Sequence, residues 1–280
     1  MSTDIEQVAA EIRTILNEEG FKLPSLPDTV IKVQQLMAKE DYSVGEVSDI
    51  LVRDSAFATV VLRLANSARF NNTGREIRNM TMAIQRVGTA SILKLLISVA
   101  SRLFCDIKQP ALREIMAHNH DHSLLVSAAA EQVAHISQSA NPADTFMAGL
   151  LHDQGKDVLM IAIPDALLAT GIPERGRLVT MFHREMGARL LHHWRLPEEF
   201  VLVAQHHGIE SPDRPRLGIL DCVDVADAIV HNMADGEEGM NDERAASPPV
   251  QRLRLSHTQI TGIVMDIEDR FEELKQAFAT

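Results

Sequence analysis

Apolar residues recur every three to four positions along most of this chain, which is the spacing of helices that bury one face. The clearest case runs from residue 258 to residue 278, where most of the charged residues fall on the opposite face. Its apolar face comprises Ile260, Ile263, Val264, Ile267, Phe271, Leu274 and Phe278. No long alternation of apolar and polar residues, as expected for strands, interrupts the pattern. We therefore predict an all-α fold.

Residues that cap helices stand where these apolar patterns begin. Ser43 and Glu46 have the spacing of a capping box, and Asp54 and Asn141 are suited to N-caps. The predicted helices cover residues 4–19, 29–37, 44–52, 55–68, 82–87, 89–103, 111–135, 142–164, 177–194, 197–207, 217–231 and 258–278.

Two breaks divide the pattern. Gln109-Pro110 separates an N-terminal helical bundle, residues 1–108, from a second helical domain, residues 109–280, on which we expect the bundle to pack. Residues 234–249 are rich in Gly, Asp, Glu, Ser and Pro, which predicts a mobile loop before the last amphipathic helix.

Composition narrows the class of protein. Hydrophobic residues make up 45% of the chain and aromatic residues only 4%, which favours helices over strands. The net charge of −12 argues against a broad nucleic-acid or anionic-membrane surface. Two cysteines, Cys105 and Cys222, give no disulfide framework, and no apolar run approaches the ~20 residues of a membrane span. We predict a cytoplasmic protein.

The candidate chemistry centres on His152-Asp153, an adjacent pair inside an apolar stretch that predicts a helix. A buried charged pair is costly unless it is paired or holds a metal. Imidazole nitrogen and carboxylate oxygen together suit zinc, manganese or iron. Further metal-competent residues lie on other predicted helices: His122, His183, His206, His207 and Asp224.

The order of these motifs resembles that of the HDOD domain, a bacterial signalling relative of the HD metal-dependent phosphohydrolases. The resemblance covers roughly residues 20–230. Its N-terminal motifs are Leu23-Pro24-Ser25-Leu26-Pro27, Arg53-Asp54-Ser55-Ala56, residues 62–68 (LRLANSA) and residues 83–88 (AIQRVG). Its C-terminal motifs are His122-Ser123, residues 148–153 (AGLLHD), residues 183–187 and residues 194–199 (WRLPEE) leading to His206-His207.

By this resemblance the second domain is HD-like, and its metal ligands are a histidine, an adjacent His-Asp pair and a later aspartate. His122, His152, Asp153 and Asp224 would hold a first metal. Further histidines, His183, His206 and His207, would hold a second, with Asp153 as the bridge. The implied cofactor is a divalent metal, namely Fe, Mn, Zn or Mg.

Several of these assignments have alternatives. Asp227 lies nearly one turn from Asp224 and could replace it as the ligand. Asp153 and Lys156 are assigned to the catalytic set, in which Lys156 would balance phosphate charge. The alternative is that Lys156 is an ordinary solvated lysine. The remaining histidines of these segments are expected to face solvent: His118, His120, His192 and His193.

The resemblance implies a regulatory protein that acts through protein partners. The first alternative is a metal-dependent phosphohydrolase acting on a nucleotide or phosphoester, so the sequence leaves open whether the protein is an enzyme. The second is a non-catalytic scaffold with a relic site. Gly208-Ile209-Glu210 follows His207 where the HD-GYP phosphodiesterases carry Gly-Tyr-Pro, which argues against cyclic-dinucleotide hydrolysis of that kind.

Overall fold

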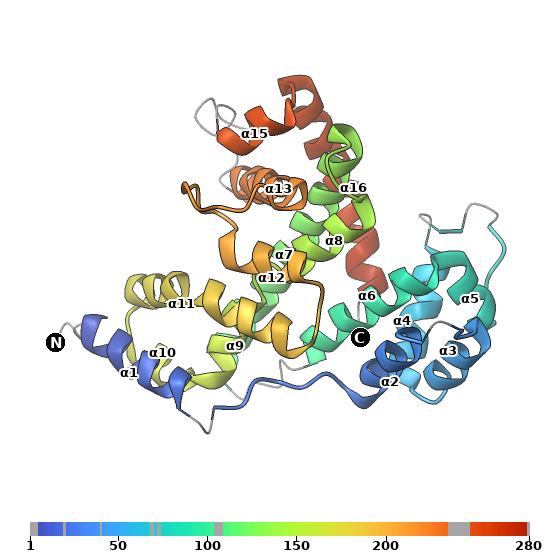
Figure 1. Cartoon of the computed structure of the whole chain (residues 1–280), viewed down its shortest axis with the longest axis horizontal. Helices are drawn as coiled ribbons and strands as arrows, with labels where there is room; N and C mark the ends of the chain where they lie inside the picture. Colours follow the sequence, from blue (N-terminus) through green and yellow to red (C-terminus); the bar gives the residue numbers. More distant parts are fainter. Residues whose placement is uncertain are drawn as a thin grey trace. The chain divides into compact units, whose positions relative to one another are not determined.

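A computed structural model describes residues 5–18, 21–39, 41–67, 70–71, 74–103, 109–234 and 247–278. All regular structure in these ranges is helical, which confirms the predicted fold class (Figure 1). The helices are α1 (Ile5–Asn17), α2 (Asp28–Met37), α3 (Val44–Leu51), α4 (Ser55–Asn66), α5 (Met80–Val87), α6 (Thr89–Leu103), α7 (Pro110–Ser137), α8 (Pro142–Leu151), α9 (Gln154–Ala162), α10 (Pro164–Ala169), α11 (Ile172–His193), α12 (Glu198–His206), α13 (Gly218–Ala234), α15 (Pro248–Leu253) and α16 (His257–Phe278).

The chain forms two compact units. The larger unit comprises Met1–Ser25 and Phe104–Met265, and the smaller comprises Leu26–Leu103 and Asp266–Thr280. The boundary predicted at residue 108 stays a prediction. The N-terminal 25 residues group with the larger unit, and α16 is divided between the two.

The smaller unit contains α2 to α6 (Figure 1). These helices pack around fully buried aliphatic side chains such as Val33, Leu51, Ile84 and Leu96. Within the larger unit the long helix α7 packs against α8 and α13, while α9 packs against α11. The candidate metal residues all belong to the larger unit.

The capping predictions are confirmed. Ser43 N–H donates to Glu46 Oε2 at 2.9 Å, and Glu46 N–H donates to Ser43 Oγ at 3.2 Å, which completes the capping box. The side chain of Asp54 accepts from Phe57 N–H, and that of Asn141 accepts from Asp144 N–H.

The predicted helices differ from those of the structure in several places. The helix expected over residues 142–164 is two helices, since α8 ends at Leu151 and α9 begins at Gln154. His152-Asp153 therefore occupies the junction rather than the interior of one helix. The short helices α10 and α15 were missed because six residues carry too little periodicity to predict, although each opens with a proline.

Some predictions fall on residues that the structure does not describe. Residues 235–246, most of the predicted mobile loop, lie outside the described ranges, as does Cys105. Cys222 is described and is a buried free thiol.

Two glycines let helices of the larger unit approach closely. A Cβ added at Gly155 in α9 would lie 1.8 Å from the His183 carbonyl oxygen and 2.5 Å from the Gly187 nitrogen in α11. A Cβ added at Gly149 in α8 would lie 2.9 Å from the Ser127 Cα in α7. Since real Cβ atoms do not approach so closely, glycine is required at both crossings.

No single helix in the described ranges is long and apolar enough to cross a membrane. The pair α5–α6 meets the length and composition test only when taken together across a 100° bend.

Candidate metal centre

Five helical segments bring histidine and carboxylate side chains together in the larger unit. His122 comes from α7, His152 and Asp153 from the junction between α8 and α9, and His183 from α11. His207 follows the end of α12. From α13 come Asp227 and His231. Ligand atoms within 4.8 Å of one another form three groups: His122, His152 and Asp153; His122, Asp227 and His231; and Asp153, His183 and His207.

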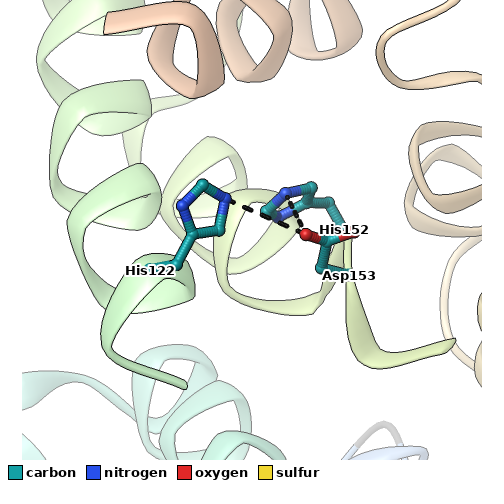
Figure 2. Close-up of side chains that lie close together, drawn as sticks. All are labelled: His122, His152 and Asp153. Atoms are coloured by element: carbon teal, nitrogen blue, oxygen red, sulfur yellow. Dashed lines mark ion pairs between the residues drawn. The ribbon is translucent and has the colours of Figure 1, made fainter. Parts of the chain in front are cut away.

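Asp153 lies at the centre of this cluster and is 4% exposed. Its Oδ2 atom lies 3.3 Å from His152 Nε2 and 3.8 Å from His122 Nε2, and Figure 2 shows both rings facing this carboxylate. Its Oδ1 atom lies 3.3 Å from His207 Nε2 and 3.6 Å from His183 Nε2. Each oxygen of Asp153 thus faces a different pair of histidines, as expected of a carboxylate that bridges two cations.

Main-chain carbonyl groups orient three of these rings. The Nδ1 atom of His152 lies 2.6 Å from Gly149 O, that of His183 lies 3.0 Å from Val179 O, and that of His207 lies 3.0 Å from Ala204 O. Because a carbonyl only accepts, each Nδ1 carries a proton and donates. Each ring then directs its Nε2 at Asp153, which is the arrangement of histidines that bind metals through Nε2.

This arrangement brings Nε2 and carboxylate oxygen atoms close together. The Nε2 atoms of His183 and His207 are 3.2 Å apart, and Asp227 Oδ1 lies 3.0 Å from His122 Nε2. Among the described residues, four buried side-chain atoms of this cluster make no hydrogen bond: His122 Nε2, His152 Nε2, Asp153 Oδ1 and Asp227 Oδ1. An unsatisfied buried polar atom costs about 1–3 kcal/mol. Divalent cations would satisfy these atoms, so the donor set fits a metal.

The pKa shifts of three of these side chains favour a metal site. Burial lowers the pKa of His183 to about 4, so this imidazole is neutral at pH 7 and free to act as a ligand. Burial also lowers the pKa of His122. Burial alone would raise the pKa of Asp153, but the neighbouring His152, His207 and Lys156 hold it well below its usual range, so the carboxylate is ionised.

Asp224, which the resemblance assigned to the first metal, is not brought into the cluster. Its Oδ2 accepts from Arg214 Nη2 at 2.5 Å, and its Oδ1 accepts from Gly208 N–H at 2.9 Å. Asp227, the alternative to Asp224, lies beside His122, with 3.0 Å between Asp227 Oδ1 and His122 Nε2. The two positions lie ~60° apart around α13, and only helix packing decides which of them faces the histidines.

His206 also lies outside the three groups of ligand atoms, which were found among the described residues. It is half-buried, and its pKa is lowered by burial and by the charge of Arg214. The side chain of the neighbouring His207 faces Asp153 instead.

The other histidines follow the predictions with one exception. His192, His193 and His118 are exposed, as predicted. His120 is half-buried rather than exposed.

Three residues near the cluster were missed. His231 Nδ1 lies 3.2 Å from Asp227 Oδ1, and this contact raises the pKa of His231 to about 9. The i,i+4 spacing of Asp227 and His231 on one helix was an available signal. Asn119 Nδ2 donates to Asp157 Oδ1 at 3.2 Å, and burial raises the pKa of Asp157 to about 7. No sequence pattern links Asn119 to Asp157, since 38 positions separate them.

Comparison with known proteins confirms the resemblance. The HDOD domain family model matches residues 23–209. A protein from Shewanella amazonensis SB2B, provisionally named a metal-dependent phosphohydrolase, has a similar structure with a TM-score of 0.78 at 22% identity, covering 98% of this chain and 99% of that one. An HDOD domain protein of unknown function from Geobacter sulfurreducens gives a TM-score of 0.68 at 24% identity, covering 98% of both chains. At these identities the two structures show a shared fold.

A curated relative comes from Treponema pallidum (strain Nichols) and is an uncharacterized protein. It is 23% identical over 248 residues, which are 85% of this chain. The chain spans about half of that relative's length, at 47%.

Proposed function

The chain belongs to the HDOD domain family, and from that premise we propose that it is a regulatory protein whose HD-like centre binds two divalent metal ions. The observation that carries this proposal is the set of buried Nε2 and Oδ1 atoms that converge without hydrogen-bond partners. In a relic site these polar side chains would be expected to be replaced during evolution, since each unsatisfied buried atom destabilises the fold when no metal binds it.

The donor set divides into two halves that share Asp153. In the first half, His122, His152, Asp153 and Asp227 would hold one ion. In the second half, Asp153, His183 and His207 would hold the other. Neutral imidazoles with ionised carboxylates favour manganese, iron or zinc over magnesium, which prefers oxygen ligands and retains waters.

Metal content tests this proposal directly. We expect the full chain, purified without chelator, to carry up to two equivalents of transition metal by elemental analysis. Substituting His122→Ala should remove one equivalent, because this ring faces only the first half of the site. A wild-type protein that stays metal-free after dialysis against manganese, iron and zinc would contradict the proposal.

The second candidate function is hydrolysis of a phosphoester. Two divalent ions at such a centre would supply a clamp for the attacking and leaving oxygens of an in-line displacement at phosphorus. The observation that favours it is Lys156, whose Nζ pairs with Asp153 Oδ2 while the side chain remains 25% exposed. This ammonium group could neutralise a phosphate that approaches the centre.

Hydrolysis of bis(4-nitrophenyl) phosphate by the manganese-loaded chain separates the two functions. If the chain is a phosphohydrolase, Lys156→Met should lower kcat/KM by about tenfold or more, because the charge-assisted contact with phosphate is lost. The control is Lys32→Met, which removes an exposed lysine from the smaller unit. No turnover by metal-loaded wild type would reject the enzyme and retain the regulatory function.

A further inference from the structure

A group of charged side chains contacts the turn that follows His207 and has no part in the ligand set. Arg214 belongs to the segment between α12 and α13, and its side chain is fully buried. Its Nη1 donates to Asp221 Oδ1 at 2.7 Å and its Nη2 donates to Asp224 Oδ2 at 2.5 Å. A buried guanidinium is expensive to desolvate, so it indicates either fold specificity or a functional constraint.

The Arg214–Asp224 ion pair is linked to the metal centre by a hydrogen bond between Asp224 and Gly208. His207 ends α12 with an extended backbone (φ −58°, ψ 144°), and Gly208 then adopts a positive φ of 67°. At this turn the Gly208 N–H donates to Asp224 Oδ1 at 2.9 Å. The carboxylate therefore anchors the residue that directly follows the candidate ligand His207.

Arg214 fixes that carboxylate in turn. Its planar guanidinium group donates hydrogen bonds to both Asp221 and Asp224, which lie about one turn apart on α13. On its other side Asp221 also accepts two bonds from Arg252 of α15, at 2.8 and 2.7 Å. Asp221 therefore forms ion pairs with two arginines, Arg214 and Arg252. Among the described residues, Asp224 forms an ion pair with Arg214 alone.

We propose that the Arg214–Asp224 ion pair is a positioning device that holds His207 in place for the second half of the metal centre. Through the Gly208 N–H it fixes the backbone where the chain leaves α12, and so the direction of the His207 ring toward Asp153 Oδ1. The inference rests on the proposed metal-binding function. It also gives Asp224 a role, since this residue resembles a ligand in sequence but supports a ligand in the structure.

The test compares Co²⁺ binding by the full-length wild type with that of the double variant Arg214→Met/Asp224→Leu. Replacing both partners by apolar residues of similar size leaves no buried unpaired charge at these two positions, and such replacements often preserve stability. Asp221 keeps its pairing with Arg252. The matched control is Arg252→Gln, which weakens the same network but leaves Asp224, Gly208 and Arg214 in contact.

We expect the wild type to bind two equivalents of Co²⁺. In the double variant the first equivalent should bind as in the wild type, while the second should weaken by about 10- to 100-fold, the usual effect of removing a group that orients a ligand. The visible absorption of bound Co²⁺ should change only in the part that appears with the second equivalent. Arg252→Gln should bind both equivalents normally.

Each result decides one question. A double variant that binds both equivalents as tightly as the wild type would overturn the positioning role, as would an equal loss in Arg252→Gln. A double variant that does not fold, judged by circular dichroism, would also overturn it, because the pair would then be a requirement of folding. A wild type that binds no Co²⁺ would instead reject the proposed function itself.

Discussion

Asp153→Ala is expected to abolish the stabilisation of this protein by divalent metal. Among the carboxylates that the structure describes, Asp153 alone lies within 4 Å of four histidines, two at each oxygen. Its removal therefore takes a ligand from both halves of the site. A metal that binds only the folded state stabilises it by about 2.7 kcal/mol per site at 100 times its Kd. For a chain of this size that corresponds to roughly 5–10 °C in Tm.

Thermal melts of wild type and Asp153→Ala, each with manganese and with chelator, measure this effect. The wild type should melt at a higher temperature with manganese, and the variant should melt at one temperature under both conditions. Asp213→Ala is the control, because Asp213 is an exposed aspartate of the same unit. A variant that gains as much Tm from manganese as the wild type would show that Asp153 is not a ligand.

Gly155→Ala should destabilise the larger unit and disorganise the second half of the metal centre. The added methyl group would meet the His183 carbonyl oxygen at 1.8 Å and the Gly187 nitrogen at 2.5 Å, and neither backbone atom can move aside as a flexible side chain would. Overpacking usually costs about 1–3 kcal/mol, and a clash with helix backbone lies at the upper end or beyond. Separation of α9 from α11 would also draw His183 away from Asp153.

Urea denaturation and metal titration test both consequences. Gly176→Ala is a matched control, since it changes a glycine of α11 to alanine where no atom lies within 4 Å of the added Cβ. It should be neutral or stabilising by up to about 1 kcal/mol, because alanine favours helix. Equal stability of Gly155→Ala and Gly176→Ala would contradict the close crossing of α9 and α11.

Local chemistry accounts for what could be predicted from the sequence. Apolar residues at helical spacing mark most helices, because each helix buries one face. Ser43, Asp54 and Asn141 mark helix starts, because their side chains bond to amides within the next turn. His152-Asp153 stands out because its two residues are adjacent, and its family motif identifies it without any knowledge of packing.

Only the tertiary structure decided between neighbouring candidates on one helix. Asp224 and Asp227 are equivalent in residue type, and their roles diverge because α13 turns one toward Arg214 and the other toward His122. The junction at His152 and the need for glycine at 155 likewise depend on how α8 and α9 meet their neighbours. Spacing along a chain determines which residues share a helix face. Which face meets the ligands depends on contacts between residues far apart in sequence, and these arise only when the helices pack.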